Sequence, residues 1–103
     1  MLLYQKVGCF QDNVHRRDLS AHPTLVAITQ EKCVKECAMQ DEAFSYFALQ
    51  NGSKCFCGRR YGKYGRVPEE MCNKHCLGNE EENCGGENSN MIYFYGIGIV
   101  EYL

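Results

Sequence analysis

The chemistry open to this sequence depends first on its eight cysteines. They are Cys9, Cys33, Cys37, Cys55, Cys57, Cys72, Cys76 and Cys84. A zinc site needs ligand pairs such as Cys-x-x-Cys, whereas three, one and three residues separate the close pairs here. A redox centre would also need Cys-x-x-Cys, in a βαβ unit. Structural disulfides are therefore expected, and an even number of cysteines in 103 residues favours an oxidising, extracellular location.

A basic segment with two tyrosines is the second chemically suggestive feature. Residues 59–66, RRYGKYGR, hold four basic residues and no acidic one, although the whole chain has a net charge of −2. Tyrosine rings stack on sugar rings, and guanidinium groups bind sulfate or carboxylate groups. The candidate ligand-binding residues are Arg59, Arg60, Tyr61, Lys63, Tyr64, Arg66 and, as a polar partner on the neighbouring turn, Asn51. The alternative is that the segment only balances the acidic run 80–82 across the surface.

Other classes of function are disfavoured. The same charges and rings would suit nucleic acid, but the expected extracellular location argues against it. Ser20 and His22 have no acid placed to complete a catalytic triad. The run 80–82 is interpreted as a solvated acidic turn, because calcium loops intersperse their ligands around a glycine turn. We therefore expect no enzyme, no metal and no cofactor, and no stretch has the 18 apolar residues of a membrane span.

A short helix and a hairpin must position the central cysteines. Thr29 is a plausible helix N-cap, and apolar residues recur with helical spacing from Cys33 to Ala38, so a helix is expected to end near Gln40. Asn51-Gly52, between two runs of strand-forming residues, predicts a two-residue hairpin turn. The triplet 51–53, Asn-Gly-Ser, is also an N-glycosylation sequon if the turn is exposed in a secretory host.

The two elements have matching pitch. Residues four apart on a helix lie about 6 Å apart along its axis, and residues two apart on a strand are spaced by about 6.6 Å. Cys33 and Cys37 can therefore form two disulfides with Cys55 and Cys57. Both the parallel pairing and the crossed pairing fit this geometry.

A two-residue turn also fixes a register for the hairpin. It places Ala48 opposite Cys55, and Tyr46 opposite Cys57. Because strand faces alternate, one set of side chains should face the helix, and a core of helix and strand residues should form there. The residues expected on the helix side are Phe44, Tyr46 and Ala48, packed with Val34 and Ala38; those expected on the opposite face are Phe47, Leu49 and Phe56.

The remaining chain supplies two further strands and a tail. Residues 4–10 and 91–95 have strand-like composition, and the segment 71–86 is predicted to be a compact loop clipped by cysteines. Residues 96–103 form either an extra edge strand or a tail. The first three residues, Met-Leu-Leu, lack the features of a signal peptide, which favours a fragment of a larger ectodomain.

Several of these groups occur together in a pattern that resembles the WSC domain, a cysteine-rich extracellular module. The groups are Val7-Gly8-Cys9-Phe10 with Asp12, Arg17-Asp18-Leu19, Cys33-x-x-x-Cys37, Tyr46-Phe47-Ala48-Leu49-Gln50, Cys55-Phe56-Cys57-Gly58, Cys72-Asn73-x-x-Cys76-x-Gly78-Asn79, Cys84-Gly85-Gly86 and Tyr93. The family often has glycine in place of Ala48 and an aromatic-free segment where residues 59–66 run. The chain after Tyr95 has no counterpart in the pattern.

The resemblance implies a small α+β fold over residues 4–95, similar to PAN and apple domains, with one main helix packed on an antiparallel sheet and four disulfides. It favours the pairs Cys33–Cys55 and Cys37–Cys57 over the crossed alternative. Of the other four cysteines, we expect Cys76–Cys84 to close a short polar loop, which leaves Cys9–Cys72. The implied role is non-catalytic carbohydrate binding, and the runner-up is a protein–protein interaction module.

Overall fold

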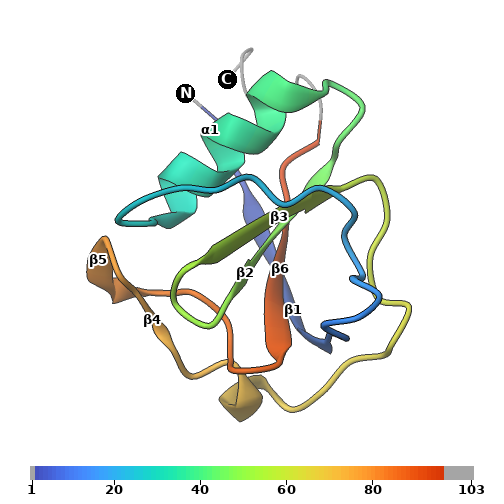
Figure 1. The fold of residues 1–103 in the computed structure, drawn as a ribbon, viewed down its shortest axis with the longest axis vertical. Helices are drawn as coiled ribbons and strands as arrows, with labels where there is room; N and C mark the ends of the chain where they lie inside the picture. Colours follow the sequence, from blue (N-terminus) through green and yellow to red (C-terminus); the bar gives the residue numbers. More distant parts are fainter. Residues whose placement is uncertain (1, 97–103) are drawn as a thin grey trace.

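A four-stranded antiparallel sheet with one helix packed against it forms the centre of the computed structural model, which describes residues 2–96 (Figure 1). The elements are β1 (Gln5–Gln11), α1 (Gln30–Gln40), β2 (Tyr46–Gln50), β3 (Lys54–Gly58), the 3-10 turn η1 (Glu69–Met71), β4 (His75–Cys76), β5 (Asn79–Asn83) and β6 (Ser89–Phe94). The sheet order is β1-β6-β2-β3, while β4 and β5 form a separate ribbon. The α+β class is confirmed.

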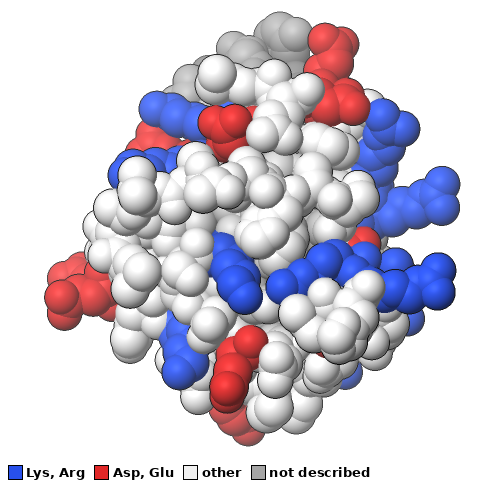
Figure 2. Space-filling model, in the orientation of Figure 1, with Lys and Arg blue, Asp and Glu red and all other residues white. Residues whose placement is uncertain are grey.

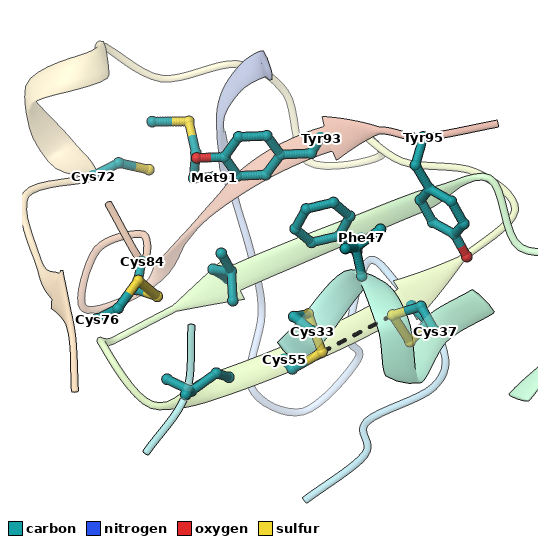
Figure 3. Close-up of a cluster of buried hydrophobic side chains, with 14 of the residues drawn as sticks. Cys33, Cys37, Phe47, Cys55, Cys72, Cys76, Cys84, Met91, Tyr93 and Tyr95 are labelled. Atoms are coloured by element: carbon teal, nitrogen blue, oxygen red, sulfur yellow. Dashed lines mark hydrogen bonds between the residues drawn. A yellow bond between two sulfur atoms is a disulfide. The ribbon is translucent and has the colours of Figure 1, made fainter. Parts of the chain in front are cut away.

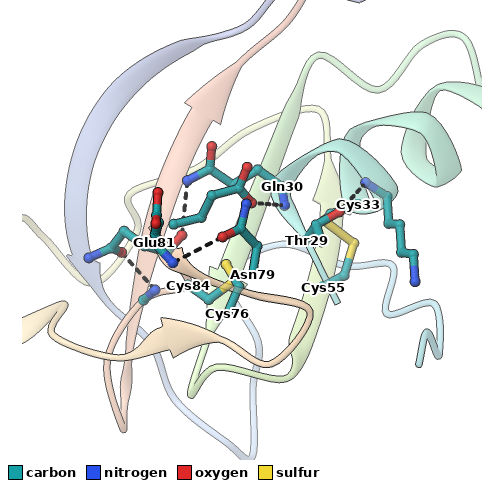
Figure 4. The surroundings of a disulfide bond; sticks show 12 residues. Thr29, Gln30, Cys33, Cys55, Cys76, Asn79, Glu81 and Cys84 are labelled. Atoms are coloured by element: carbon teal, nitrogen blue, oxygen red, sulfur yellow. Dashed lines mark hydrogen bonds between the residues drawn. A yellow bond between two sulfur atoms is a disulfide. The ribbon is translucent and has the colours of Figure 1, made fainter. Parts of the chain in front are cut away.

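Helix α1 begins where its sequence predicts. Thr29 is extended (φ −133°), and its hydroxyl oxygen accepts a hydrogen bond from the Lys32 backbone N–H at 3.0 Å (Figure 4). This N-cap satisfies one of the amides that a first helical turn leaves free. The Gln30 side chain donates to the Asn83 carbonyl at 3.0 Å and so ties the helix start to the ribbon. At Asp41 the backbone is extended again, and the helix ends.

Four disulfides connect these elements, and Figure 3 draws Cys33–Cys55 and Cys76–Cys84 among them. They are Cys33–Cys55, Cys37–Cys57, Cys9–Cys72 and Cys76–Cys84, the pairs that we expected. The first two hold α1 on β3 in the parallel arrangement, with Cα–Cα distances of 5.6 and 5.4 Å. Sulfur atoms of Cys33, Cys37 and Cys55 lie within 4.8 Å of one another, but all three are bonded in disulfides and offer no free thiolate to a metal.

The β2–β3 turn has one more residue than predicted. Asn51 and Gly52 have φ of 56° and 77°, the left-handed conformations for which the Asn-Gly pair was singled out. The Ser53 N–H donates to the Gln50 carbonyl at 3.2 Å. Strand pairing nevertheless resumes at Gln50 and Lys54, so Ser53 is a third loop residue. The predicted register is therefore wrong by one residue.

This shift exchanges the two faces of β2. Phe47 and Leu49 pack beside the disulfides on the helix side, whereas Tyr46 and Ala48 belong with Phe56 on the other face. The predicted positions of the four β2 side chains are thus wrong, and that of Phe56 is confirmed. The other residues expected on the helix side and found there are Val34, Ala38 and Phe44.

Both faces of the sheet are covered. On the helix side, the ring of Phe47 stacks on that of Tyr93 with centroids 4.9 Å apart (Figure 3). On the other face, Leu19 from the long loop after β1 is buried with Phe56 and Ile92. The apolar side chains of the central strands therefore meet a hydrophobic layer on either face of the sheet.

Irregular segments also protect both edges of the sheet. Ala21 exchanges two backbone hydrogen bonds with Cys57 of β3, at 3.0 and 2.8 Å. Along β1, the Gln11 N–H donates to the Gly65 carbonyl and the Val67 N–H donates to the Cys9 carbonyl, both at 3.0 Å. Backbone groups that would otherwise invite another strand are thereby occupied.

The segment 71–86, predicted as a loop, contains the β4–β5 ribbon, whose turn is closed by the fourth disulfide. Gly85 has φ 81°, and a side chain there would lie 2.0 Å from the Leu49 carbonyl oxygen, so the ribbon can dock against β2 only with glycine here.

Within residues 2–96, no helix has the length and apolar character to cross a membrane. Apart from Gly96, the tail 96–103 lies outside the described residues.

Candidate functional site

An open hollow of about 690 Å³ brings four of the predicted binding residues together. We call it the basic hollow; it is lined by Asp18, Ser20, Asp41, Phe44, Gly58, Arg59, Arg60, Tyr61 and Lys63. Three segments meet here: the loop after β1, the turn after α1, and the chain leaving β3. In Figure 2, basic side chains gather on the side where the loops 12–18 and 59–67 run in Figure 1.

The loop carrying the cations is held by one carboxylate. Asp18 accepts hydrogen bonds from the backbone N–H groups of Gly62 at 2.6 Å and Lys63 at 3.2 Å. Gly62 has φ 89°, a conformation that other residues adopt only under strain. The loop is therefore fixed through its backbone, which leaves the side chains of Arg60 and Lys63 exposed to solvent.

Asp18 is itself positioned by a buried network around Asp12. One Asp12 oxygen accepts the Asp18 N–H at 2.9 Å; the other accepts from the Arg17 guanidinium and the Gln50 amide, both at 2.9 Å. Burial by itself would raise the pKa of Asp12, but hydrogen bonds from backbone N–H groups, Gln50 and Arg17 together hold that pKa below its ordinary value. Asp12 therefore stays ionised although it is 5% exposed.

The charges around the basic hollow are partly paired. Asp41 accepts hydrogen bonds from the Ala43 N–H at 2.9 Å and from the Arg59 guanidinium at 3.0 Å, which together lower the pKa of Asp41. Among the described residues, Arg60 and Lys63 form no ion pair with a carboxylate. The site thus presents two exposed cations beside one neutralised pair.

Two aromatic residues, Phe44 and Tyr61, line the basic hollow, and Tyr61 is half-buried. Its ring meets Phe10 edge-on at 5.1 Å and lies 4.7 Å from the ring of Tyr46. Both partners belong to the hydrophobic cluster on the side of the sheet opposite the helix. Tyr61 therefore anchors the loop in the core and is held in one orientation at the edge of the hollow.

Three predicted binding residues do not line the basic hollow. The Tyr64 hydroxyl donates to the Arg16 carbonyl, so Tyr64 fastens one loop to another. The Arg66 guanidinium lies over the ring of Phe10, 4.8 Å from its centroid. It also lies against the backbone of Gly8, where any side chain would collide with it. These contacts give both side chains a structural role.

Asn51 lies at the tip of the β2–β3 hairpin, and Arg59 follows the other end of β3. A five-residue strand separates the two positions, and such a strand is about 17 Å long. The sequence placed Asn51 beside the loop because the two are close along the chain, but an extended strand carries them apart.

Five lining residues were not among the predicted binding residues: Asp18, Ser20, Asp41, Phe44 and Gly58. The neighbours Arg17-Asp18-Leu19 were noted as a group, and the structure shows that Asp18 anchors the basic loop. Asp41 follows directly after the helix, and its pairing with Arg59 joins segments 18 residues apart. No periodicity or motif signals a contact of that kind.

Comparison with known proteins places this architecture. Residues 6–86 match the WSC domain family. The chain is 36% identical over 94 residues to "Xylosyltransferase oxt" of Drosophila melanogaster, covering 88% of this chain and 10% of that protein. It is 29% identical over 90 residues to "Kremen protein 1" of Homo sapiens (84% and 19%), and 32% identical over 90 residues to "Protein SLG1" of Saccharomyces cerevisiae (87% and 23%). The chain thus spans about a tenth to a quarter of these relatives.

Proposed function

The chain belongs to the WSC domain family, and on that premise we propose that it is an extracellular, non-catalytic module that binds glycans in the basic hollow. One observation carries the proposal: two exposed cations, Arg60 and Lys63, which form no ion pair within residues 2–96, stand beside the ring of Tyr61 on a loop whose backbone is held by Asp18. The four disulfides support an oxidising, extracellular location.

The carboxylates of the basic hollow favour binding over hydrolysis. Glycoside hydrolysis needs a carboxylic acid whose pKa is raised, paired with a second carboxylate. Here the pKa of Asp41 is lowered by hydrogen bonds from Ala43 and Arg59, so this group is ionised near neutral pH. Both oxygens of Asp18 accept backbone hydrogen bonds and serve to hold the loop.

The same arrangement favours a glycan that carries carboxylate or sulfate groups. Tyr61 and Phe44 provide partly exposed aromatic surface, against which the C–H faces of a sugar can pack. Arg60 and Lys63 are free to bind an anionic substituent. Because these charges are exposed, binding should weaken from low to physiological salt, where the screening length falls to about 8 Å.

The test is a glycan array that contains matched neutral and sulfated or uronate-bearing glycans, followed by affinity measurement on the best hit. The double variant Arg60→Ala/Lys63→Ala should lose at least about tenfold in affinity, since even one charge-assisted hydrogen bond contributes about 1.5–3 kcal/mol. A charge-matched control, Lys35→Ala/Lys74→Ala, alters exposed lysines outside the hollow and should bind like the unmodified chain.

Two outcomes would contradict the proposal. Unchanged affinity of the Arg60→Ala/Lys63→Ala variant would remove the site from the basic hollow. An array without any hit for the folded chain would remove glycans as the ligand class, and would favour a protein partner on this face.

A further inference from the structure

The tip of the β2–β3 hairpin carries the sequon Asn51-Gly52-Ser53, and Asn51 is exposed. We propose that Asn51 is an attachment site for an N-linked glycan. This inference rests on the extracellular location in the proposed function, because the modification occurs on chains that enter the secretory pathway. It does not depend on what the basic hollow binds.

The turn is held in place by its backbone alone. The Asn51 N–H donates to the Gly86 carbonyl at 2.9 Å, the Gly52 N–H donates to the Cys84 carbonyl at 3.0 Å, and the Gly52 carbonyl accepts from Leu77 at 3.0 Å. The side-chain amide of Asn51 takes part in none of the hydrogen bonds recorded for residues 2–96. A glycan on this amide would therefore break no contact of the fold.

The surface around the turn supplies a second, independent reason. Leu77 is 74% exposed, an apolar side chain in contact with water. Leu77 lies beside the turn, since its N–H donates to the Gly52 carbonyl at 3.0 Å. A bulky, hydrated glycan on Asn51 would cover this apolar side chain.

Attachment is a glycosyl transfer from a lipid-linked oligosaccharide diphosphate, the donor class that the reaction requires. The amide nitrogen of Asn51 forms a bond to C1 of the first sugar and gives up one proton. The bond between C1 and the diphosphate oxygen breaks, and the lipid diphosphate leaves with the electron pair. No electrons are exchanged with an oxidant, so the atoms balance with these two partners alone.

The position also separates the two carbohydrate roles of this domain. Strand β3 sets Asn51 and the basic hollow at opposite ends of the hairpin. A glycan at the tip therefore covers the surface near Leu77 and leaves the hollow open. Asn51 then acts as the carrier of a glycan and not as a ligand-binding residue.

To test this, the chain would be directed through the secretory pathway of an animal cell line, and the intact mass of the secreted and lumenal protein measured. The chain without substitutions should carry an added oligosaccharide mass. Peptide-N-glycosidase should remove this mass and convert the side chain at position 51 to that of Asp. Asn51→Gln and Ser53→Ala should both abolish the added mass, whereas Ser53→Thr, which preserves the sequon, should retain it. Asn88→Gln, an exposed asparagine outside any sequon, is the matched control and should not change it.

The inference would be overturned if the chain without substitutions formed all four disulfides and carried no added mass. An added mass that persists in the Asn51→Gln variant would also overturn it. Array binding before and after enzymatic removal of the glycan should be equal. Loss of array binding with the mass still present contradicts only the proposed function, and absence of the mass with array binding retained contradicts only this inference.

Discussion

Replacing Asp12 with alanine is expected to lower the free energy of unfolding by about 3 kcal/mol, since removing one partner of a buried ion pair costs about 3–5 kcal/mol. The lower end applies because the Arg17 side chain is 21% exposed and can regain water, whereas that of Asp12 is 1% exposed. The change also removes the acceptor for the Gln50 amide and for the Asp18 N–H. Urea denaturation of the oxidised chain measures the effect.

The second part of this prediction concerns the basic hollow. Without Asp12, the Asp18 backbone loses its anchor, and the Asp18 carboxylate holds the Gly62 and Lys63 amides less firmly. Hydrogen exchange at these two amides should therefore accelerate more than exchange in the central strands. Glu69→Gln is the matched control, because it removes a carboxylate from an ion pair whose side chains are half-exposed, and such pairs contribute about 0–1 kcal/mol.

A loss of stability below about 1 kcal/mol would place Asp12 with ordinary surface carboxylates and refute the network argument. A large loss with unchanged exchange at Gly62 and Lys63 would refute the link from Asp12 to the hollow. Both measurements, urea denaturation and hydrogen exchange, are made on the free protein and need no ligand.

The lowered pKa of Asp12 adds a pH signature. A carboxyl whose pKa is lower in the folded state than in the unfolded state stabilises the fold at pH values above its unfolded-state pKa. This contribution is lost as the pH falls through the folded-state pKa. With an ordinary value of 3.8 for the unfolded chain, the stability of the unmodified protein should fall below about pH 4. The Asp12→Ala variant should show a shallower decline over the same range, measured by urea midpoints at successive pH values. Equal slopes would contradict the assignment.

Two further predictions concern the covalent and hydrophobic core. Removing the Cys9–Cys72 disulfide by alanine substitution should lower the free energy of unfolding by about 4 kcal/mol, and removing Cys76–Cys84 by about 2.5 kcal/mol. The difference arises because loop-closure entropy grows with sequence separation, which is 63 for the first pair and 8 for the second. A reversed order of the denaturant midpoints would contradict this entropic account. Phe47→Ala should cost about 3–5 kcal/mol in the same assay, because the ring is fully buried on the helix side, and a nearly neutral effect would contradict the packing of this ring in the core.

The helix and its disulfides were predictable because their signals are local. Thr29 provides the N-cap, and the four-residue spacing of Cys33 and Cys37 places both sulfur atoms on one side of the helix. The choice between parallel and crossed pairing was not local, and it rested on the family resemblance. The structure has the parallel pairs.

The hairpin register was not predictable, for a physical reason. Alternation reveals register only when one face of a strand is buried and the other is wet. In β2, Phe47 and Ala48 are both fully buried, on opposite sides of the sheet, and Leu49 and Gln50 after them are buried as well. Overpacking Ala48 with leucine would destabilise either register, so a loss of stability at this position does not distinguish the two registers.

For the candidate site, the sequence revealed charge but not geometry. It identified the basic loop, yet Tyr61 meets Phe10 and Tyr46 through contacts that span the chain, so its burial could not be anticipated. The carboxylates Asp18 and Asp41 reach the loop across 44 and 18 residues of sequence. Contacts of this kind follow from the whole topology, which a single sequence does not display.

The pairing of β1 with β6 governs how the module transmits mechanical load when both of its ends continue into a longer chain. Gln5 lies opposite Phe94 in antiparallel strands, so the two connections leave the sheet side by side, and tension between them acts on that strand pair first. The shortest covalent route then runs from Cys9 directly to Cys72 and from Cys76 directly to Cys84. Residues 10–71, which include α1, the hairpin and the lining of the basic hollow, lie off this route. Tension along the parent chain therefore bypasses the segments that form the hollow, and pulling on the module does not stretch its binding surface.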